Sequence, residues 1–251
     1  MLKIEDNDGI ELMRIQHGKA NAVDSELLEG LGDALREVAA RDARALVITG
    51  SGSIFSAGVD LFKVLSGGID YLDGFVPLLS SVLREVFEFP KPLVAAMNGH
   101  AIAGGCILAC ACDYKVMAEG SGGVGVPELR VGVPFPAVPL EIVRMVVPRR
   151  YLQEVVLLGR TYEPEDARER GLVDEVVSAD DLEERALEIA FEMASVGADS
   201  FALSKRQLRR PVLDAMDLTG QLFDDEVEGL WKAPGSHEAI RTYLEKTVGK
   251  G

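Results

Sequence analysis

The sequence predicts an α/β fold built from ββα-type turns of a spiral, followed by a helical region without strands. Apolar patterning gives the order β-β-α-β over residues 2–50, and the pattern begins a second round after a glycine-rich loop at 50–61. Repeated units of this length favour stacked turns of a spiral over a doubly wound sheet. Toward the end of the chain, capped amphipathic helices replace the strands.

The first round opens with a β-hairpin. Strands are predicted at 2–5 and 10–16, because the turn between them carries the Asp, Asn and Gly residues of a tight connection. The elements expected next are a connector at 19–23, a helix capped by Asp24 or Ser25, and an apolar strand at 45–50.

The second round follows the glycine-rich loop. The sequence predicts a helix at 74–89, a strand at 92–97, a central loop and helix, and a strand at 114–117. A glycine-rich stretch at 120–125 and a helix at 140–147 follow.

From residue 162 onward the chain is mainly helical. The predicted elements are a helix at 163–170, a strand at 173–176, and helices at 180–196, 199–210, 214–231 and 236–247. These helices must pack on the first part of the chain or on another subunit, because amphipathic helices are marginal alone. The basic residues among them are expected on a solvated face, and they are Lys205, Arg206, Arg209 and Arg210.

Composition narrows the class of partner. The 251 residues carry 41 acidic against 26 basic side chains, a formal charge of −15. Nucleic acids and anionic membrane surfaces are bound through basic footprints, so neither is expected as a partner. The N-terminus is charged and no apolar run is long enough to span a bilayer. We expect a cytoplasmic protein.

The cysteines predict neither a metal site nor a disulfide framework. Cys106, Cys110 and Cys112 all lie in one stretch of small residues, and no second cluster exists to complete such a site. They are expected to be core residues.

The junction around Gly104-Gly105 is the first candidate for chemistry. An apolar strand breaks at Asn98-Gly99, and the glycine pair falls where the loop becomes a helix. Unpaired N–H groups at such a place stabilise negative charge, on a phosphate or on an oxyanion. The spacing fits neither a P-loop nor a dinucleotide fingerprint. The alternative to an anion-binding role is that the glycine pair only allows the helix to pack close to its neighbours.

Several motifs together are more specific. In chain order they are the segment 55–61 (FSAGVDL), Asn98-Gly99-His100-Ala101 with Gly104-Gly105, Cys112-Asp113, and Pro127-Glu128. In this order and spacing the chain resembles the crotonase superfamily, the enoyl-CoA hydratase/isomerase family, from about residue 10 to residue 180. The resemblance implies a crotonase-like core at 1–190 and a C-terminal helical oligomerisation region at 191–251, which forms a homotrimer or a dimer of trimers.

The resemblance also implies the chemistry. Family members hold the carbonyl oxygen of an acyl-CoA thioester with two backbone N–H groups, which by motif fall on Val59 and Gly104. Fixed amide donors stabilise an enolate without reorganising, and each is worth on the order of 10²–10³ in rate. Coenzyme A is part of the substrate, and no other cofactor is implied. The implied CoA contacts are Lys19, Ala20, Ala22, Ala57, Gly58, Asp60, Leu61, Gly105 and Pro127.

The sequence departs from the family's hydratases at one of two acidic positions. Glu128 matches the second glutamate, but Ile107 stands where the first is expected, and an apolar side chain cannot hold or deprotonate water. One carboxylate suffices to move a proton between two carbons, so the resemblance favours a 3-enoyl-CoA to 2-enoyl-CoA isomerase. Apolar neighbours would raise the pKa of Glu128 toward a useful range.

Other functions stay open on the sequence. A hydratase or another crotonase-type lyase or hydrolase is the first alternative, and His100 is the residue near the centre that could serve it. His100 itself is expected to be structural. The alternative from a different class is a non-catalytic acyl-CoA-binding subunit.

Overall fold

Two β-sheets form the centre of the computed structural model, which describes residues 1–120 and 122–247. The larger sheet has the order β1-β2-β3-β5-β7-β10. Its strands are β1 (Leu2–Asn7), β2 (Ile10–Ile15), β3 (Ala45–Thr49), β5 (Leu93–Met97), β7 (Tyr114–Ala118) and β10 (Glu175–Val177). The hairpin β1–β2 is antiparallel, and the other pairs of this sheet are parallel.

The smaller sheet has the order β4-β6-β8-β9. Its strands are β4 (Ile54–Ser56), β6 (His100–Ile102), β8 (Val124–Gly125) and β9 (Thr161–Tyr162). Successive strand pairs β3/β4, β5/β6 and β7/β8 each place one strand in each sheet, next to the equivalent strand of the preceding pair. This arrangement is the predicted spiral of stacked turns.

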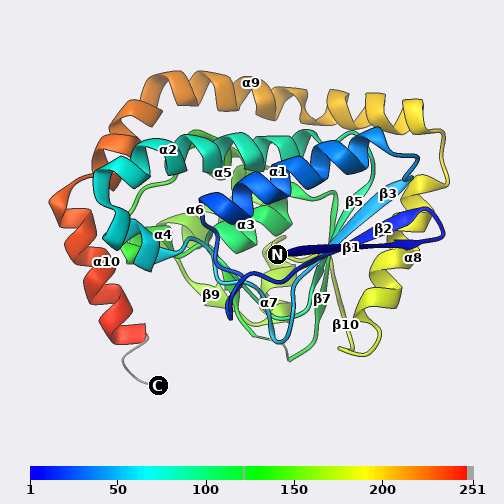
Figure 1. Cartoon of the computed structure of the whole chain (residues 1–251), viewed down its shortest axis with the longest axis horizontal. Coiled ribbons are helices and arrows are strands. Elements are labelled where there is room, and N and C mark those ends of the chain that lie inside the picture. Colours follow the sequence, from blue (N-terminus) through cyan, green and yellow to red (C-terminus); the bar gives the residue numbers. More distant parts are fainter. Residues whose placement is uncertain (121, 248–251) are drawn as a thin grey trace.

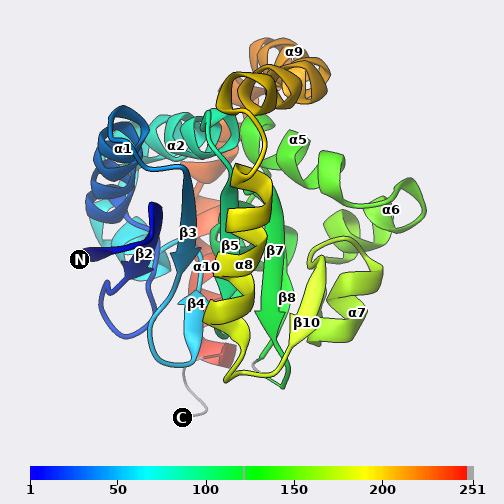
Figure 2. The same cartoon turned by 90° about the vertical axis from the view of Figure 1, so that its right-hand side faces the viewer.

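Both faces of the larger sheet are covered. Helix α8 (Leu182–Ala194) lies across β3, β5 and β7 on one face (Figure 2). The other face packs against α1 (Ser25–Ala40), α2 (Leu61–Glu88) and α3 (Gly104–Ala111). The central strands β3 and β5 are buried at every position, which explains why their sequences are almost entirely apolar.

Short helices connect the last turn of the spiral to the C-terminal helices. They are α4 (Glu128–Val131), α5 (Ala137–Val146), α6 (Arg149–Leu158) and α7 (Pro164–Glu169). Helix α9 (Ala198–Trp231) then crosses the molecule over α2 and α5, and α10 (Pro234–Thr247) returns past α4 (Figure 1). Among the residues that the structure describes, no helix is long and apolar enough to span a membrane.

The three cysteines are buried in α3 and directly after it, with free thiols, as expected of core residues.

Two predicted helix boundaries are wrong. Helix α2 begins at Leu61 instead of residue 74, because Asp60 caps it: its Oδ1 accepts the N–H groups of Phe62 and Lys63, each at 3.0 Å. Gly68, with φ of 61°, kinks the helix between the two parts. The predicted helices 199–210 and 214–231 are one helix, α9, which continues through Pro211.

Side chains buried on both sides of Pro211 hold α9 together. A proline inside a helix removes one hydrogen bond and costs about 3 kcal/mol, which is why the sequence predicts a break. Arg209 precedes Pro211 and Leu213 and Met216 follow it, and all three are buried. Tertiary packing therefore outweighs the local cost.

The prediction of a solvated basic face is also wrong for two of its four members. Arg206 and Arg210 are exposed, but Lys205 and Arg209 are 7% and 5% exposed. Lys205 Nζ lies 2.6 Å from Asp113 Oδ2, and Arg209 Nη2 lies 2.8 Å from Asp113 Oδ1. The guanidinium of Arg209 also stacks over the Phe87 ring at 4.2 Å. This buried ionic cluster fastens the start of α9 to the end of α3.

We expect Arg209→Ala to lower the free energy of unfolding by about 3–5 kcal/mol, because it leaves the Asp113 carboxylate buried with one partner fewer. Arg210→Ala is the matched control: its exposed pair with Asp214 should contribute less than about 0.5 kcal/mol. Urea unfolding at one protein concentration measures both. Equal losses in the two variants would contradict the role of the cluster.

Candidate active site

The first glycine loop lies beside the connector that precedes α1. The Ala57 N–H donates to the Ala20 carbonyl at 3.0 Å, and the Val23 N–H donates to the Gly58 carbonyl at 2.7 Å. The next residue, Val59, is bridged to Val23 in parallel, a pairing that does not use the Val59 N–H. Among the described residues this N–H has no hydrogen-bond partner.

The second glycine loop leads from β6 into α3. Ala103 has φ of 50°, unusual for a residue with a side chain, and its N–H donates to the Gly125 carbonyl at 2.8 Å. Gly104 is the first residue of α3, so its N–H has no acceptor within the helix. Within residues 1–120 and 122–247 it has no other acceptor.

The two loops approach so closely that glycine is required in both. A Cβ at position 58 would lie 2.5 Å from the Ile102 carbonyl oxygen, and Gly58 also has φ of 82°. A Cβ at position 105 would lie 2.4 Å from the Ser56 carbonyl oxygen. Side chains at either position would force the loops apart.

Val59 and Gly104, the residues that carry these two free N–H groups, both line one cavity. The walls are mainly aliphatic and aromatic. The lining residues are Ala57, Val59, Leu61, Leu79, Leu83, Ile102, Ala103, Gly104, Ile107, Pro127, Glu128, Val131, Val133, Phe135, Pro136, Pro139, Trp231 and Tyr243.

Glu128 carries the one carboxyl group among these lining residues. It is the first residue of α4 and is 7% exposed, and its Oε2 has no hydrogen-bond partner among the described residues. Burial raises the pKa of Glu128 to about 8, and a hydrogen bond to its own backbone N–H opposes the rise slightly. A pKa near the working pH suits a group that takes up and returns a proton.

The structure brings only some of the predicted site residues to the cavity. Those that line it are Ala57, Val59, Leu61, Gly104, Pro127 and Glu128. Gly58 and Gly105 lie where the two loops meet, and Asp60 caps α2. Lys19, Ala20 and Ala22 lie in the connector beside the first loop, where Lys19 is exposed. Ile107 faces the cavity and is 2% exposed, so no second carboxylate stands at that position.

His100 has a structural partner. It lies in β6, and its Nδ1 accepts the Gly123 N–H at 3.0 Å. It does not line the cavity.

The C-terminal wall of the cavity was not predicted from the sequence. Trp231 ends α9 and Tyr243 lies in α10, and both line the site. No motif marks either residue. The one available signal was compositional, because Trp231 is the single tryptophan of the chain.

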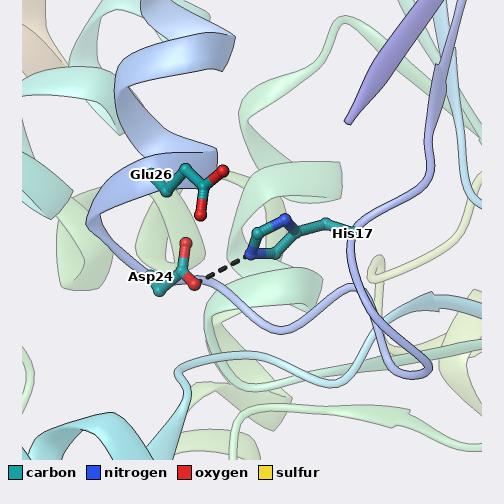
Figure 3. Close-up of side chains that lie close together, drawn as sticks. All are labelled: His17, Asp24 and Glu26. Carbon is teal, nitrogen blue, oxygen red and sulfur yellow. Dashed lines mark hydrogen bonds and ion pairs between the residues drawn. The ribbon is translucent and has the colours of Figure 1, made fainter.

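A second polar cluster lies outside the cavity, where His17, Asp24 and Glu26 gather at the start of α1 (Figure 3). His17 Nε2 lies 2.8 Å from Asp24 Oδ2, and Lys63 Nζ lies 2.5 Å from the same oxygen. Burial raises the pKa of Asp24, but hydrogen bonds from Lys63, Leu27 N–H and His17 outweigh it and leave that pKa lowered. The Lys63 ammonium already supplies the cation for this carboxylate, so the cluster ties α1 to the start of α2.

Comparisons with known proteins agree on one family. A family profile described as "Enoyl-CoA hydratase/isomerase" matches residues 5–249. The rat protein "Enoyl-CoA hydratase domain-containing protein 3, mitochondrial" is 31% identical over 247 residues, which cover 95% of this chain and 80% of the rat protein.

Solved structures give the same result. The apo structure of an enoyl-CoA isomerase from Mycobacterium tuberculosis is 30% identical with a TM-score of 0.79, and the match covers 86% of this chain and 94% of that one. Human mitochondrial delta3-delta2-enoyl-CoA isomerase, 22% identical, has a TM-score of 0.92 over 99% of this chain and 98% of its own, so the two share the fold. The names of these relatives include both hydratase and isomerase.

Proposed function

The chain belongs to the enoyl-CoA hydratase/isomerase family, and from this membership we propose that it converts 3-enoyl-CoA to 2-enoyl-CoA, with Glu128 as its proton-transferring side chain. The observation that carries the proposal is the single carboxyl group in the cavity wall, next to an aliphatic side chain at position 107. Adding water to an enoyl thioester needs acid and base groups that hold the water, whereas shifting a double bond needs one group that moves a proton.

The proposed reaction has two proton transfers. The Glu128 carboxylate takes a proton from C2 of the substrate, and the electron pair passes through the thioester carbonyl to give a dienolate. The N–H groups of Val59 and Gly104 donate hydrogen bonds to its oxygen. The Glu128 carboxylic acid then returns the proton to C4, the double bond moves to C2–C3, and the side chain is again a carboxylate.

The local geometry supports each role. Val59 and Gly104 both line the cavity, and their N–H groups have no protein acceptor among the described residues, so these groups are available to a ligand. The aliphatic surroundings keep water from competing and raise the pKa of Glu128, which makes its carboxylate a stronger base.

We expect the purified protein to convert a 3-enoyl-CoA to the conjugated thioester, measured as a rise in enoyl-thioester absorbance. Crotonyl-CoA should hydrate slowly or not at all. Ile107→Glu should gain water addition, because it restores a second carboxylate beside the same amides. Hydration of crotonyl-CoA by the unmodified protein at ordinary enzyme rates would favour the hydratase alternative. Absence of any turnover would favour an acyl-CoA-binding subunit.

We also propose that the protein assembles as a trimer or a dimer of trimers. Large apolar side chains are exposed on α6 and α9, more than isolated surface residues would explain. They are Leu157, Leu158, Leu203, Leu208, Leu218, Leu222, Phe223 and Leu230. Light scattering at micromolar concentration should give three or six times the chain mass of 27.0 kDa. A monomer at that concentration would contradict this proposal.

A further inference from the structure

Helix α10 forms a fixed wall of the cavity. Its Ala239 methyl approaches α4 so closely that a Cβ at position 132 would lie 2.4 Å from it, and Gly132 has φ of 99°. Ile240, on the same helix, is fully buried. These contacts hold Tyr243 at a defined place relative to Glu128, at the start of α4.

Few of the residues that line the cavity have a polar side chain. Of the lining residues, only Glu128, Trp231 and Tyr243 have a side chain that can donate or accept hydrogen bonds. The Trp231 Nε1–H already donates to the Pro134 carbonyl at 2.9 Å. The Tyr243 hydroxyl makes no hydrogen bond to any residue that the structure describes, Glu128 included.

The Tyr243 hydroxyl is therefore an available donor. Tyr243 is half-buried, and burial, the largest effect, raises its pKa, so the phenol stays protonated at neutral pH. Two smaller effects on the Tyr243 pKa oppose each other: the charge of Arg130 lowers it and the charge of Glu128 raises it.

An unsubstituted hydrocarbon chain offers no hydrogen-bond acceptor to this hydroxyl. Packed against methylene groups, the phenol loses water and gains no partner, which disfavours such a ligand. A site that offers a polar group to its ligand discriminates against the analogue that lacks the matching group. A phenylalanine at position 243 would give the same apolar wall without the cost of removing water from a hydroxyl group.

We propose that Tyr243 is a specificity-determining residue, whose hydroxyl donates a hydrogen bond to an oxygen substituent on the acyl chain. The substrates that it favours are acyl-CoAs with a hydroxyl or keto oxygen beyond the reacting carbons. This inference rests on the proposed binding of acyl-CoA thioesters, but it does not depend on which reaction follows.

Binding of saturated thioesters tests the inference apart from catalysis, because these ligands have no double bond to shift. Isothermal titration would compare hexanoyl-CoA with its analogues hydroxylated at C5 or C6. For Tyr243→Phe, we expect about tenfold weaker binding of at least one hydroxylated analogue, with hexanoyl-CoA bound equally or more tightly. Tyr151→Phe is the control, because Tyr151 bonds Glu169 on the surface and does not line the cavity.

The outcomes separate the two proposals. For each analogue, the affinity for the hydroxylated thioester is divided by the affinity for hexanoyl-CoA. If this ratio is the same in the wild type and in Tyr243→Phe for every analogue, the role of Tyr243 is overturned, whether or not 3-enoyl-CoA is isomerised. If the ratio changes as expected but no 3-enoyl-CoA is converted, the isomerase proposal fails and the role of Tyr243 stands. If none of the thioesters binds, both fail.

Discussion

Glu128→Gln is expected to lower the rate of 3-enoyl-CoA isomerisation by roughly 10²–10⁴, the range for removal of a general base. Glutamine has nearly the same size but cannot accept the C2 proton. The two amides and the cavity wall are unchanged, so acyl-CoA binding should persist. Enoyl-thioester absorbance measures the rate, and titration with hexanoyl-CoA measures the binding.

The same variant should be more stable than the wild type at neutral pH. The folded-state pKa of Glu128 is about 8, above the ordinary glutamate value of 4.5. Between these values the unfolded chain has lost a proton that the folded protein still holds, so wild-type stability falls as pH rises from 4.5 to 8. Glutamine imitates the neutral acid and removes this slope. The expected gain at pH 7 is on the order of 3 kcal/mol.

Glu141→Gln provides the matched control. Glu141 is also buried, but it pairs with Arg144 at 3.2 Å and does not line the cavity. Its replacement should leave isomerisation unchanged and should not raise the stability. Thermal unfolding at pH 5 and pH 7 distinguishes the two variants, because only the advantage of Glu128→Gln grows with pH. Intact isomerisation in Glu128→Gln would require another base.

The pH dependence of wild-type activity follows from the same group. The carboxylate is the active form, so kcat/KM should rise about tenfold per pH unit below 8 and level off above it. A profile that is flat between pH 6 and 9 would contradict the assignment of Glu128 as base.

Gly104→Val is expected to lower the isomerisation rate by about 10²–10³ or more, comparable to loss of an oxyanion-hole donor. A Cβ at position 104 would lie 3.6 Å from Val59 Cγ2 and 3.8 Å from the Val59 nitrogen, which are ordinary contact distances. The protein should therefore fold. The methyl groups of valine would stand where the thioester oxygen must reach both amides.

Two variants separate this steric effect from a loss of folding. Gly74→Val adds the same side chain at a position with nothing within 4 Å and should leave the rate unchanged. Gly105→Ala places a Cβ 2.4 Å from the Ser56 carbonyl oxygen and should lower the melting temperature. Near wild-type turnover in Gly104→Val would show that the Gly104 amide does not bind the carbonyl.

Long strands and the residues in glycine motifs were predictable from the sequence. Strands buried on both faces, such as β3 and β5, need continuous apolar runs, and those runs are visible. Strands β4 and β8 have three and two residues, too short to show a period. They are held by their neighbours in the smaller sheet. The early start of α2 depends on the Asp60 cap, a role that the motif around Gly58 does not reveal.

The cavity was predictable only on one side. Val59, Gly104 and Glu128 occur in recognisable motifs, but Tyr243 reaches the site because α9 and α10 fold back over the core. That path depends on the buried cluster around Asp113, and charge alone does not reveal which basic side chains will be buried. Long-range packing of this kind has no local signature.

The path of α9 and α10 back over the core also sets the order in which the site is completed during synthesis. The chain is made from its N-terminus, so Val59, Gly104 and Glu128 are synthesised before Trp231 and Tyr243. Helix α9, about 50 Å long at 1.5 Å per residue, must then lie along the core before Trp231 and Tyr243 can close the wall. A nascent chain that stops short of α10 has the proton-transferring group but an open cavity. Enclosure of the substrate thus requires that α10 has been synthesised and has folded against α4.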